Sequence, residues 1–279
     1  MQTVLEILGK TEKFFAEKGV PTPKLDAQLI LAHALKCKRL ELFLRFDEPL
    51  PEASLEVIRT FVRRRAKREP LQHILGFQDF FDVKIKCDAR ALIPRQETEE
   101  LCDILTTRYF PDTSANVDIL DLGTGSGAIA IALSKYFENA KVSAVDKSEA
   151  ALSLAIENAE FNQAKVSMFI SDWFSCVEGK FDLIVANPPY LTSDEVASAE
   201  PEVKDYDPIS ALVADDAGMA DLKVIIKSAH KYLKENGILA CECGLEQPEK
   251  LASYALESGF TSAEVLQDAS KRDRFLICK

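Results

Sequence analysis

Two adjacent prolines end the apolar run in "FDLIVANPPY", residues 181–190. A proline inside a central strand removes a ladder hydrogen bond, so this pattern predicts a buried strand that stops before Asn187. The Asn187 side-chain oxygen and the Pro188 carbonyl oxygen could both accept from one planar NH2 group, against which Tyr190 could stack. Because Pro188 and Pro189 restrict the backbone, these acceptors would be oriented before anything binds. The corner favours chemistry at an amide or aromatic amine nitrogen, driven by positioning and electrostatic stabilisation.

A glycine-rich loop supplies a second candidate site. The segment "VDILDLGTGSGAIAIAL", residues 117–133, predicts a strand, then Gly123-Thr124-Gly125-Ser126-Gly127, then a helix. Glycines permit positive φ and let the backbone approach a ligand closely. The spacing also satisfies G-x-G-x-x-A when Ala128 takes the last place, so the loop alone leaves a dinucleotide dehydrogenase open.

Acidic and aromatic residues end the next two predicted strands. Asp146 closes "KVSAVD", where an acidic side chain can accept both hydroxyls of an adenosine ribose. This placement suits NAD and S-adenosylmethionine equally, and the alternative for Asp146 is a helix cap. In "SDWF", Asp172 could accept from an adenine amino group and Trp173 could border the base, the alternative being a core tryptophan.

The element pattern predicts how these residues are brought together. Residues 1–75 have helical periodicity and predict a small helical domain. Residues 76–93 alternate in "FDVKIKC" and predict a strand pair or an extended linker. From residue 94 to 279, apolar strands alternate with helices, which predicts a parallel sheet covered on both faces. Because ligands bind at the carboxyl ends of parallel strands, the residues above would meet at one edge. The predicted strands are 117–122, 141–146, 166–171, 181–186, 237–244, 263–268 and 274–279, the last two forming an antiparallel edge hairpin, and the predicted helices include 128–137, 148–161, 220–236 and 248–259.

Composition and charge limit the function classes. The chain has 279 residues, a formal net charge of −11 and a pI of about 5.0, which argues against binding nucleic acid through bulk charge. Seven cysteines without paired spacing, no signal-peptide pattern and no long apolar run predict a cytoplasmic protein without disulfides, metal or membrane anchor. The basic run of residues 63–68 predicts a solvated helix face, or else a docking patch for a partner.

The glycine loop, the acidic strand end and Asn-Pro-Pro-Tyr together resemble class I S-adenosylmethionine-dependent methyltransferases that modify planar nitrogen. Two branches share the tetrapeptide: nucleobase amino methyltransferases and protein glutamine methyltransferases. Further segments resemble the peptide chain release factor N5-glutamine methyltransferases (the HemK/PrmC family) along nearly the whole chain: "REPLQHILG" (68–76), "LIPRQETEEL" (92–101), "SDWF" (171–174), "EPEVKDYDP" (200–208) and "CECGLEQ" (241–247).

The resemblance implies a Rossmann-like α/β domain with a seven-stranded sheet behind a small N-terminal helical domain that recognises the substrate. It implies methylation of the glutamine in the Gly-Gly-Gln motif of class I release factors with S-adenosyl-L-methionine. Nothing in the pattern demands a dimer, so we expect a monomer, and the acidic charge predicts no direct nucleic-acid contact. Residues Gly123 to Gly127, Asp146, Trp173 and Asn187 would hold the cofactor. Residues Asn187, Pro188, Pro189 and Tyr190 would hold the glutamine, with Asn187, Pro188 and Tyr190 catalytic. An adenine or cytosine methyltransferase stays the alternative.

Two positions and one segment depart from the family pattern. Gln96 stands where the family usually has proline, and Asp82 where it usually has glycine. The segment "ALVADDAGMADL", residues 211–222, lacks the family's usual glycine pair. Arg95 and Glu97 belong to a motif that begins before the catalytic domain, and we expect both residues to support the site indirectly.

Overall fold

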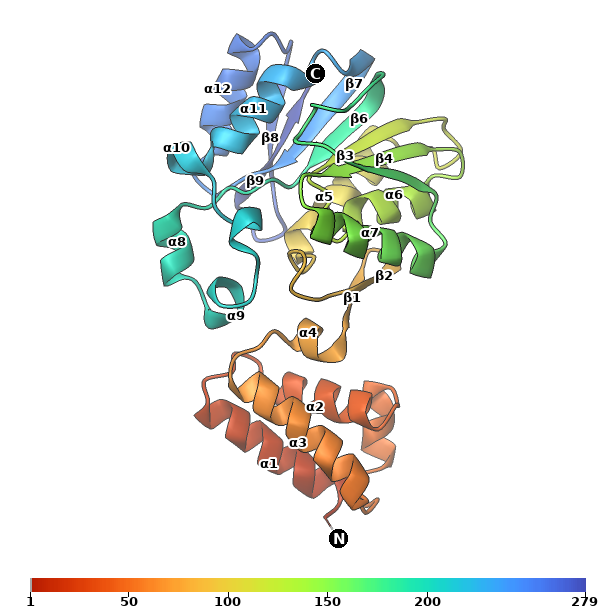
Figure 1. Cartoon of the computed structure of the whole chain (residues 1–279), viewed down its shortest axis with the longest axis vertical. Coiled ribbons are helices and arrows are strands. Elements are labelled where there is room, and N and C mark those ends of the chain that lie inside the picture. Colours follow the sequence, from red (N-terminus) through yellow and green to blue (C-terminus); the bar gives the residue numbers. More distant parts are fainter. Residues whose placement is uncertain (1) are drawn as a thin grey trace. The chain divides into compact units, whose positions relative to one another are not determined.

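The computed structural model describes residues 2–279 and divides into two compact units (Figure 1). The first unit comprises the residues up to Gly76 together with Glu200–Tyr206, and the second comprises Phe77–Ala199 and Asp207–Lys279. The predicted domain limits at residues 75 and 93 stay predictions. Residues 76–93 supply a two-stranded antiparallel sheet, β1 (Phe77–Phe80) with β2 (Val83–Lys86), which is one of the two forms that the alternating pattern suggested.

The first unit is helical, as its periodicity predicts. Thr3 and Glu6 form a capping box that begins the first helix by satisfying backbone N–H groups. Apolar side chains spaced for one helical face, such as Phe15, Leu31 and Ile58, are buried in a single core. The elements of this unit are α1 (Val4–Glu17), α2 (Pro23–Ala34), η1 (Arg39–Leu44), α3 (Glu52–Ala66), α4 (Leu71–Leu75) and α9 (Pro201–Lys204).

The basic run is only in part the solvated helix face that its composition predicts, since Arg63 and Lys67 are exposed whereas Arg65 is buried. Arg65 is only 4% exposed and donates to Asp26 over 2.6 Å and to Glu202 over 2.7 Å. Arg68 donates to Glu202 and to Glu200. The hypothesis was wrong for Arg65 and Arg68, because Glu200 and Glu202, which belong to this unit but lie far away in the sequence, form ion pairs with them.

The second unit is built on a seven-stranded sheet of order β5-β4-β3-β6-β7-β9-β8. The strands from β5 to β7 are parallel, and β9 is antiparallel to both β7 and β8, so the predicted edge hairpin is confirmed. All seven predicted strands are present, as β3 (Asp118–Leu122), β4 (Lys141–Asp146), β5 (Val166–Ile170), β6 (Phe181–Ala186), β7 (Leu233–Glu242), β8 (Ala263–Gln267) and β9 (Asp273–Cys278).

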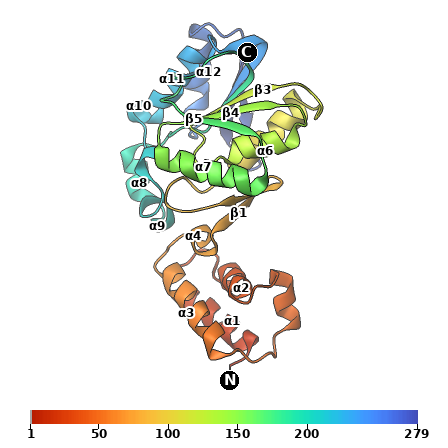
Figure 2. The same cartoon turned by 45° about the vertical axis from the view of Figure 1, so that its right-hand side comes forward.

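Helices cover both faces of this sheet (Figure 2). Successive strand residues point to opposite faces, so Ile119 joins the core beneath α5 and α6, whereas Leu120 joins the core beneath α11 and α12. No helix within residues 2–279 combines the length and apolarity needed to cross a membrane. The helical elements of this unit are α5 (Gln96–Ile104), η2 (Leu105–Tyr109), α6 (Ala128–Tyr136), α7 (Glu149–Asn162), α8 (Ser193–Ser198), η3 (Ile209–Ala211), α10 (Asp215–Gly218), α11 (Ala220–Ala229) and α12 (Pro248–Glu257).

One predicted helix is too long. The pattern predicts a helix over 220–236, but α11 ends at Ala229 and β7 begins at Leu233. Leu233 pairs with Phe181, and Asn236 has a φ of 62°, which a right-handed helix excludes. Strand pairing therefore overrides the helical spacing in this segment.

Candidate active site

The loop between β3 and α6 requires glycine at positions 123 and 127. Gly123 and Gly127 have φ values of 70° and 85°. A Cβ on Gly123 would lie 3.1 Å from the Trp173 ring, and one on Gly127 would lie 3.1 Å from the Ala155 Cβ. The glycines therefore give the loop its left-handed turns and let it lie close to neighbouring segments.

Asp146, at the carboxyl end of β4, is held in place by two backbone donors. Its Oδ2 accepts from the Gly125 N–H over 2.9 Å, and its Oδ1 accepts from the Ser148 N–H over 2.8 Å. Ser148 in turn caps α7 through its hydroxyl. The carboxylate is thus oriented by the glycine loop and by the start of the next helix, and each oxygen keeps a lone pair for a ligand.

A second carboxylate, Asp121, lies beneath the glycine loop. It is 1% exposed, and its Oδ2 accepts from the Thr124 hydroxyl over 2.6 Å and from the Ala130 N–H over 3.2 Å. Its Oδ1 is buried without a hydrogen-bond partner among the described residues. Burial raises the pKa of Asp121 to about 7, and the negative charge of Asp146 acts in the same direction.

The carboxyl end of β5 places Trp173 against the loop. Its ring lies next to Gly123, and its Nε1 donates to Asp221 over 3.3 Å. Asp172 also lines the pocket described below. A flat aromatic surface beside a carboxylate is the arrangement proposed above for an adenine base.

The Asn-Pro-Pro-Tyr corner follows β6. The Asn187 Nδ2 donates to the Thr98 hydroxyl over 2.9 Å. The Tyr190 hydroxyl donates to Glu242 over 2.9 Å and accepts from Arg274 over 2.8 Å. Burial raises the pKa of Tyr190 well above its ordinary value, and the charge of Glu242 adds to the effect. Tyr190 is therefore a neutral phenol fixed at its hydroxyl, not a base.

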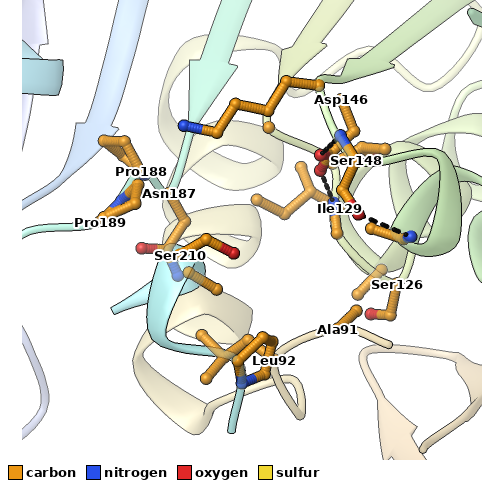
Figure 3. A pocket seen from close by; sticks show the side chains of 18 of the residues that line it. Ala91, Leu92, Ser126, Ile129, Asp146, Ser148, Asn187, Pro188, Pro189 and Ser210 are labelled. Carbon is orange, nitrogen blue, oxygen red and sulfur yellow. Dashed lines mark hydrogen bonds between the residues drawn. The ribbon is translucent and has the colours of Figure 1, made fainter. Parts of the chain in front are cut away.

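One pocket joins these strand ends. Figure 3 shows Asn187, Pro188 and Pro189 on one side, with Asp146, Ser148 and Ser126 on the other. The pocket brings together most of the predicted site residues: Gly123, Thr124, Gly125, Ser126, Asp146, Trp173, Asn187, Pro188 and Pro189. The side chain of Tyr190 lies behind the corner, and Gly127 packs against Ala155, so neither lines this pocket.

Several lining residues were not predicted individually. The loop from Arg90 to Arg95 forms one wall, Thr98 lies behind Asn187, and Ser210 belongs to the rim. The segments "LIPRQETEEL" and "EPEVKDYDP", which carry part of the family resemblance, supply part of this wall. Apart from Arg95 and Glu97, the sequence analysis assigns no role to their individual residues. Such loop residues reach the pocket only because the tertiary fold brings their segments there, which local sequence patterns do not indicate.

Arg95 and Glu97 have separate partners. Arg95 lines the pocket and donates to Asp207 over 2.5 Å. Burial raises the pKa of Asp207 to about 6 despite the opposing charge of Arg95. Glu97 accepts from Arg272 over 3.0 Å and does not line the pocket. The ion pair of Arg95 thus holds the start of the 207–211 segment against the pocket wall.

Comparisons with known proteins agree with this architecture. Residues 6–76 match the model of the PrmC N-terminal domain, and residues 99–200 match that of the methyltransferase small domain. A methyltransferase structure from Pyrococcus furiosus shares 20% identity with a TM-score of 0.56, covering 77% of this chain and 97% of that one, which shows the fold.

Curated relatives match along almost the full length. The release factor glutamine methyltransferase of Geobacter sulfurreducens is 37% identical over 98% of this chain and 95% of its own. That of Thermodesulfovibrio yellowstonii is 38% identical over 90% of this chain and 91% of its own. Such identity over both units shows common family membership. The chain belongs to the release factor glutamine methyltransferase family.

Proposed function

We propose that this enzyme transfers a methyl group from S-adenosylmethionine to the side-chain amide nitrogen of a glutamine, the one in the Gly-Gly-Gln motif of class I release factors. The observation that carries the proposal is the position of Asn187 in the pocket, opposite the oriented carboxylate of Asp146. Its full-length relatives, named for the same activity, favour glutamine over a nucleobase as the acceptor.

The residues of the pocket fit the cofactor. Asp146 offers carboxylate oxygens whose direction is fixed by Gly125 and Ser148, which suits the two hydroxyls of a ribose. Trp173 and Asp172 offer a flat apolar surface and an acceptor for the adenine base. When bound, S-adenosylmethionine supplies an electrophilic methyl group on a positively charged sulfur.

The Asn-Pro-Pro corner holds the glutamine amide. The Asn187 Oδ1 and the Pro188 carbonyl oxygen accept the two amide N–H groups and point the nitrogen at the methyl carbon. Accepting these protons offsets the positive charge that grows on nitrogen as it attacks. The amide nitrogen would form a bond to the methyl carbon while the carbon–sulfur bond breaks and its electron pair stays on the sulfur. The amide would then release one of its two protons to solvent water. Positioning of this kind requires no strong base in the pocket.

Peptide mass spectrometry tests the proposal. Unmodified release factor, incubated with the protein and S-adenosylmethionine, should gain one methyl group on the glutamine of the Gly-Gly-Gln peptide. Asn187→Ala should keep most cofactor binding and lose roughly 100- to 1000-fold in turnover, because it removes one preorganised acceptor. Asn139→Ala, an exposed asparagine that donates to the Ser114 carbonyl, is the matched control and should keep full activity. Wild-type turnover by Asn187→Ala would refute the role of Asn187.

A ligand test separates the cofactor from its rival. S-adenosylmethionine should raise the melting temperature and NADH should not, because only a ligand of the native state stabilises it. Stabilisation by NADH alone would return the glycine loop to the dehydrogenase interpretation.

We further propose that the enzyme acts in the cytoplasm as a monomer and contacts the release factor without binding nucleic acid directly. A steep salt dependence of binding to free RNA would contradict the last point.

A further inference from the structure

A buried chain of hydrogen bonds lies directly behind Asn187. The Thr98 hydroxyl donates its only proton to Glu242 Oε2 over 2.6 Å. Thr98 can therefore only accept from Asn187, whose Nδ2 lies 2.9 Å from that hydroxyl oxygen. This directs the NH2 end of the Asn187 amide toward Thr98 and leaves its oxygen end for the pocket.

Glu242 is the fixed point of this chain. The residue is fully buried, and its second oxygen, Oε1, accepts from the Tyr190 hydroxyl over 2.9 Å and from Arg274 over 3.0 Å. Arg274 also donates to the Tyr190 hydroxyl over 2.8 Å. Burial raises the pKa of Glu242, but the permanently charged Arg274 and the Tyr190 hydroxyl both donate to it and favour the ionised, acceptor-only carboxylate. Thr98 therefore directs its proton to Glu242 and not to Asn187.

The members of this chain come from separate elements. Thr98 lies on α5, Glu242 on β7 and Arg274 on β9, whereas Asn187 and Tyr190 belong to the corner after β6. Thr98 and Glu242 are both almost completely buried, so water does not compete for these hydrogen bonds. A reversed Asn187 amide would face its oxygen to the Thr98 oxygen with no proton between them, which strongly disfavours that orientation.

We infer that Thr98, anchored by Glu242, is a positioning residue that selects a primary amide over a carboxylate at this site by fixing which end of the Asn187 amide faces the substrate. The inference rests on the proposed role of Asn187. With Oδ1 toward the pocket, the site accepts the N–H groups of glutamine and repels the acceptor-only side chain of glutamate. With the amide reversed, Nδ2 would favour the glutamate.

The test compares Thr98→Val with Thr98→Ser. Valine keeps the shape but cannot accept from Asn187, whereas serine keeps the hydroxyl. Thr98→Val should lower kcat roughly 10- to 100-fold while changing the Kd for S-adenosylmethionine by less than about threefold. Thr98→Ser, which keeps the hydroxyl, should retain most of the wild-type kcat. Thr106→Val is the matched control, because Thr106 is buried and donates only to the carbonyls of Cys102 and Asp103.

A second readout separates positioning from a general structural defect. Release factor whose Gly-Gly-Gln glutamine is replaced by glutamate is tested as an inhibitor against the natural substrate. The wild-type preference for glutamine should shrink by roughly tenfold in Thr98→Val, because the released Asn187 amide can turn toward the carboxylate. An unchanged preference together with unchanged kcat would overturn the inference. That outcome would leave the proposed function intact, since the latter depends on methylation by the wild-type protein.

Discussion

The Asp146 carboxylate and the Gly125 backbone N–H are joined by a hydrogen bond of 2.9 Å, which ties the end of β4 to the glycine loop that follows β3. The two segments that we assign to the cofactor therefore hold each other in place. Because Asp146 also accepts from the Ser148 N–H, its carboxylate direction is set before a ligand arrives. Preorganisation of this kind lowers the entropy lost on binding.

Asp146→Asn should weaken S-adenosylmethionine binding roughly 10- to 100-fold, because hydrogen bonds to a charged acceptor contribute about 1.5–3 kcal/mol. Isothermal titration calorimetry measures the change. Asp194→Asn, on the exposed first turn of α8, is the matched control and should bind like the wild type. Equal affinity for wild type and Asp146→Asn would remove Asp146 from the cofactor site.

Asp121 should make stability depend on pH. Its carboxyl has an ordinary pKa of 3.8 when unfolded and about 7 when folded, so the folded state keeps its proton where the unfolded state loses it. The associated stabilisation is complete below pH 4 and is lost as the pH rises through about 7, by up to about 1.4 kcal/mol per pH unit. Urea unfolding at several pH values should show this loss in the wild type and not in Asp121→Asn. Parallel pH profiles for the two proteins would contradict the assignment.

Removing one partner of a buried ion pair in the helical unit should strongly destabilise the protein. Arg65→Met leaves the buried carboxylate of Asp26 without its cation, which costs about 3–5 kcal/mol in comparable pairs. Thermal melting should therefore show a large destabilisation. Arg63→Met, in the same basic run but exposed, should change stability by less than about 0.5 kcal/mol. Equal effects of the two substitutions would argue against the buried ion pairs.

Local sequence patterns predicted the strands and the residues at their ends, because apolar runs, glycines and prolines act on their immediate neighbours. Partners distant in sequence could not be found in this way. Glu202 meets Arg65 across 137 residues, and Glu242 meets Thr98 across 144. The end of α11 was missed for the same reason, since Leu233 becomes a strand residue only by pairing with Phe181. Long-range contacts thus determine which residues support the site, whereas local sequence patterns predict most of the residues that line it.

The segment that lacks the family's usual glycine pair carries backbone strain. Ala217 has a φ of 53°, a left-handed conformation that costs a residue with a Cβ about 1 kcal/mol or more. The turn is held there because the Gln247 amide donates to both the Ala217 and Tyr190 carbonyls. The next residue, Gly218, also packs tightly against the Tyr190 backbone, since a Cβ on it would lie only 2.1 Å from the Tyr190 oxygen.

Ala217→Gly should therefore raise the free energy of unfolding by about 1 kcal/mol, since glycine adopts the left-handed region without steric cost. Urea unfolding measures the change. Ala150→Gly, exposed in α7, is the matched control and should lower stability by up to about 1 kcal/mol, because glycine weakens a helix. The opposite signs distinguish relief of strain at Ala217 from any general effect of glycine on the unfolded chain. Destabilisation by both substitutions would mean that the turn after residue 214 is not strained at Ala217.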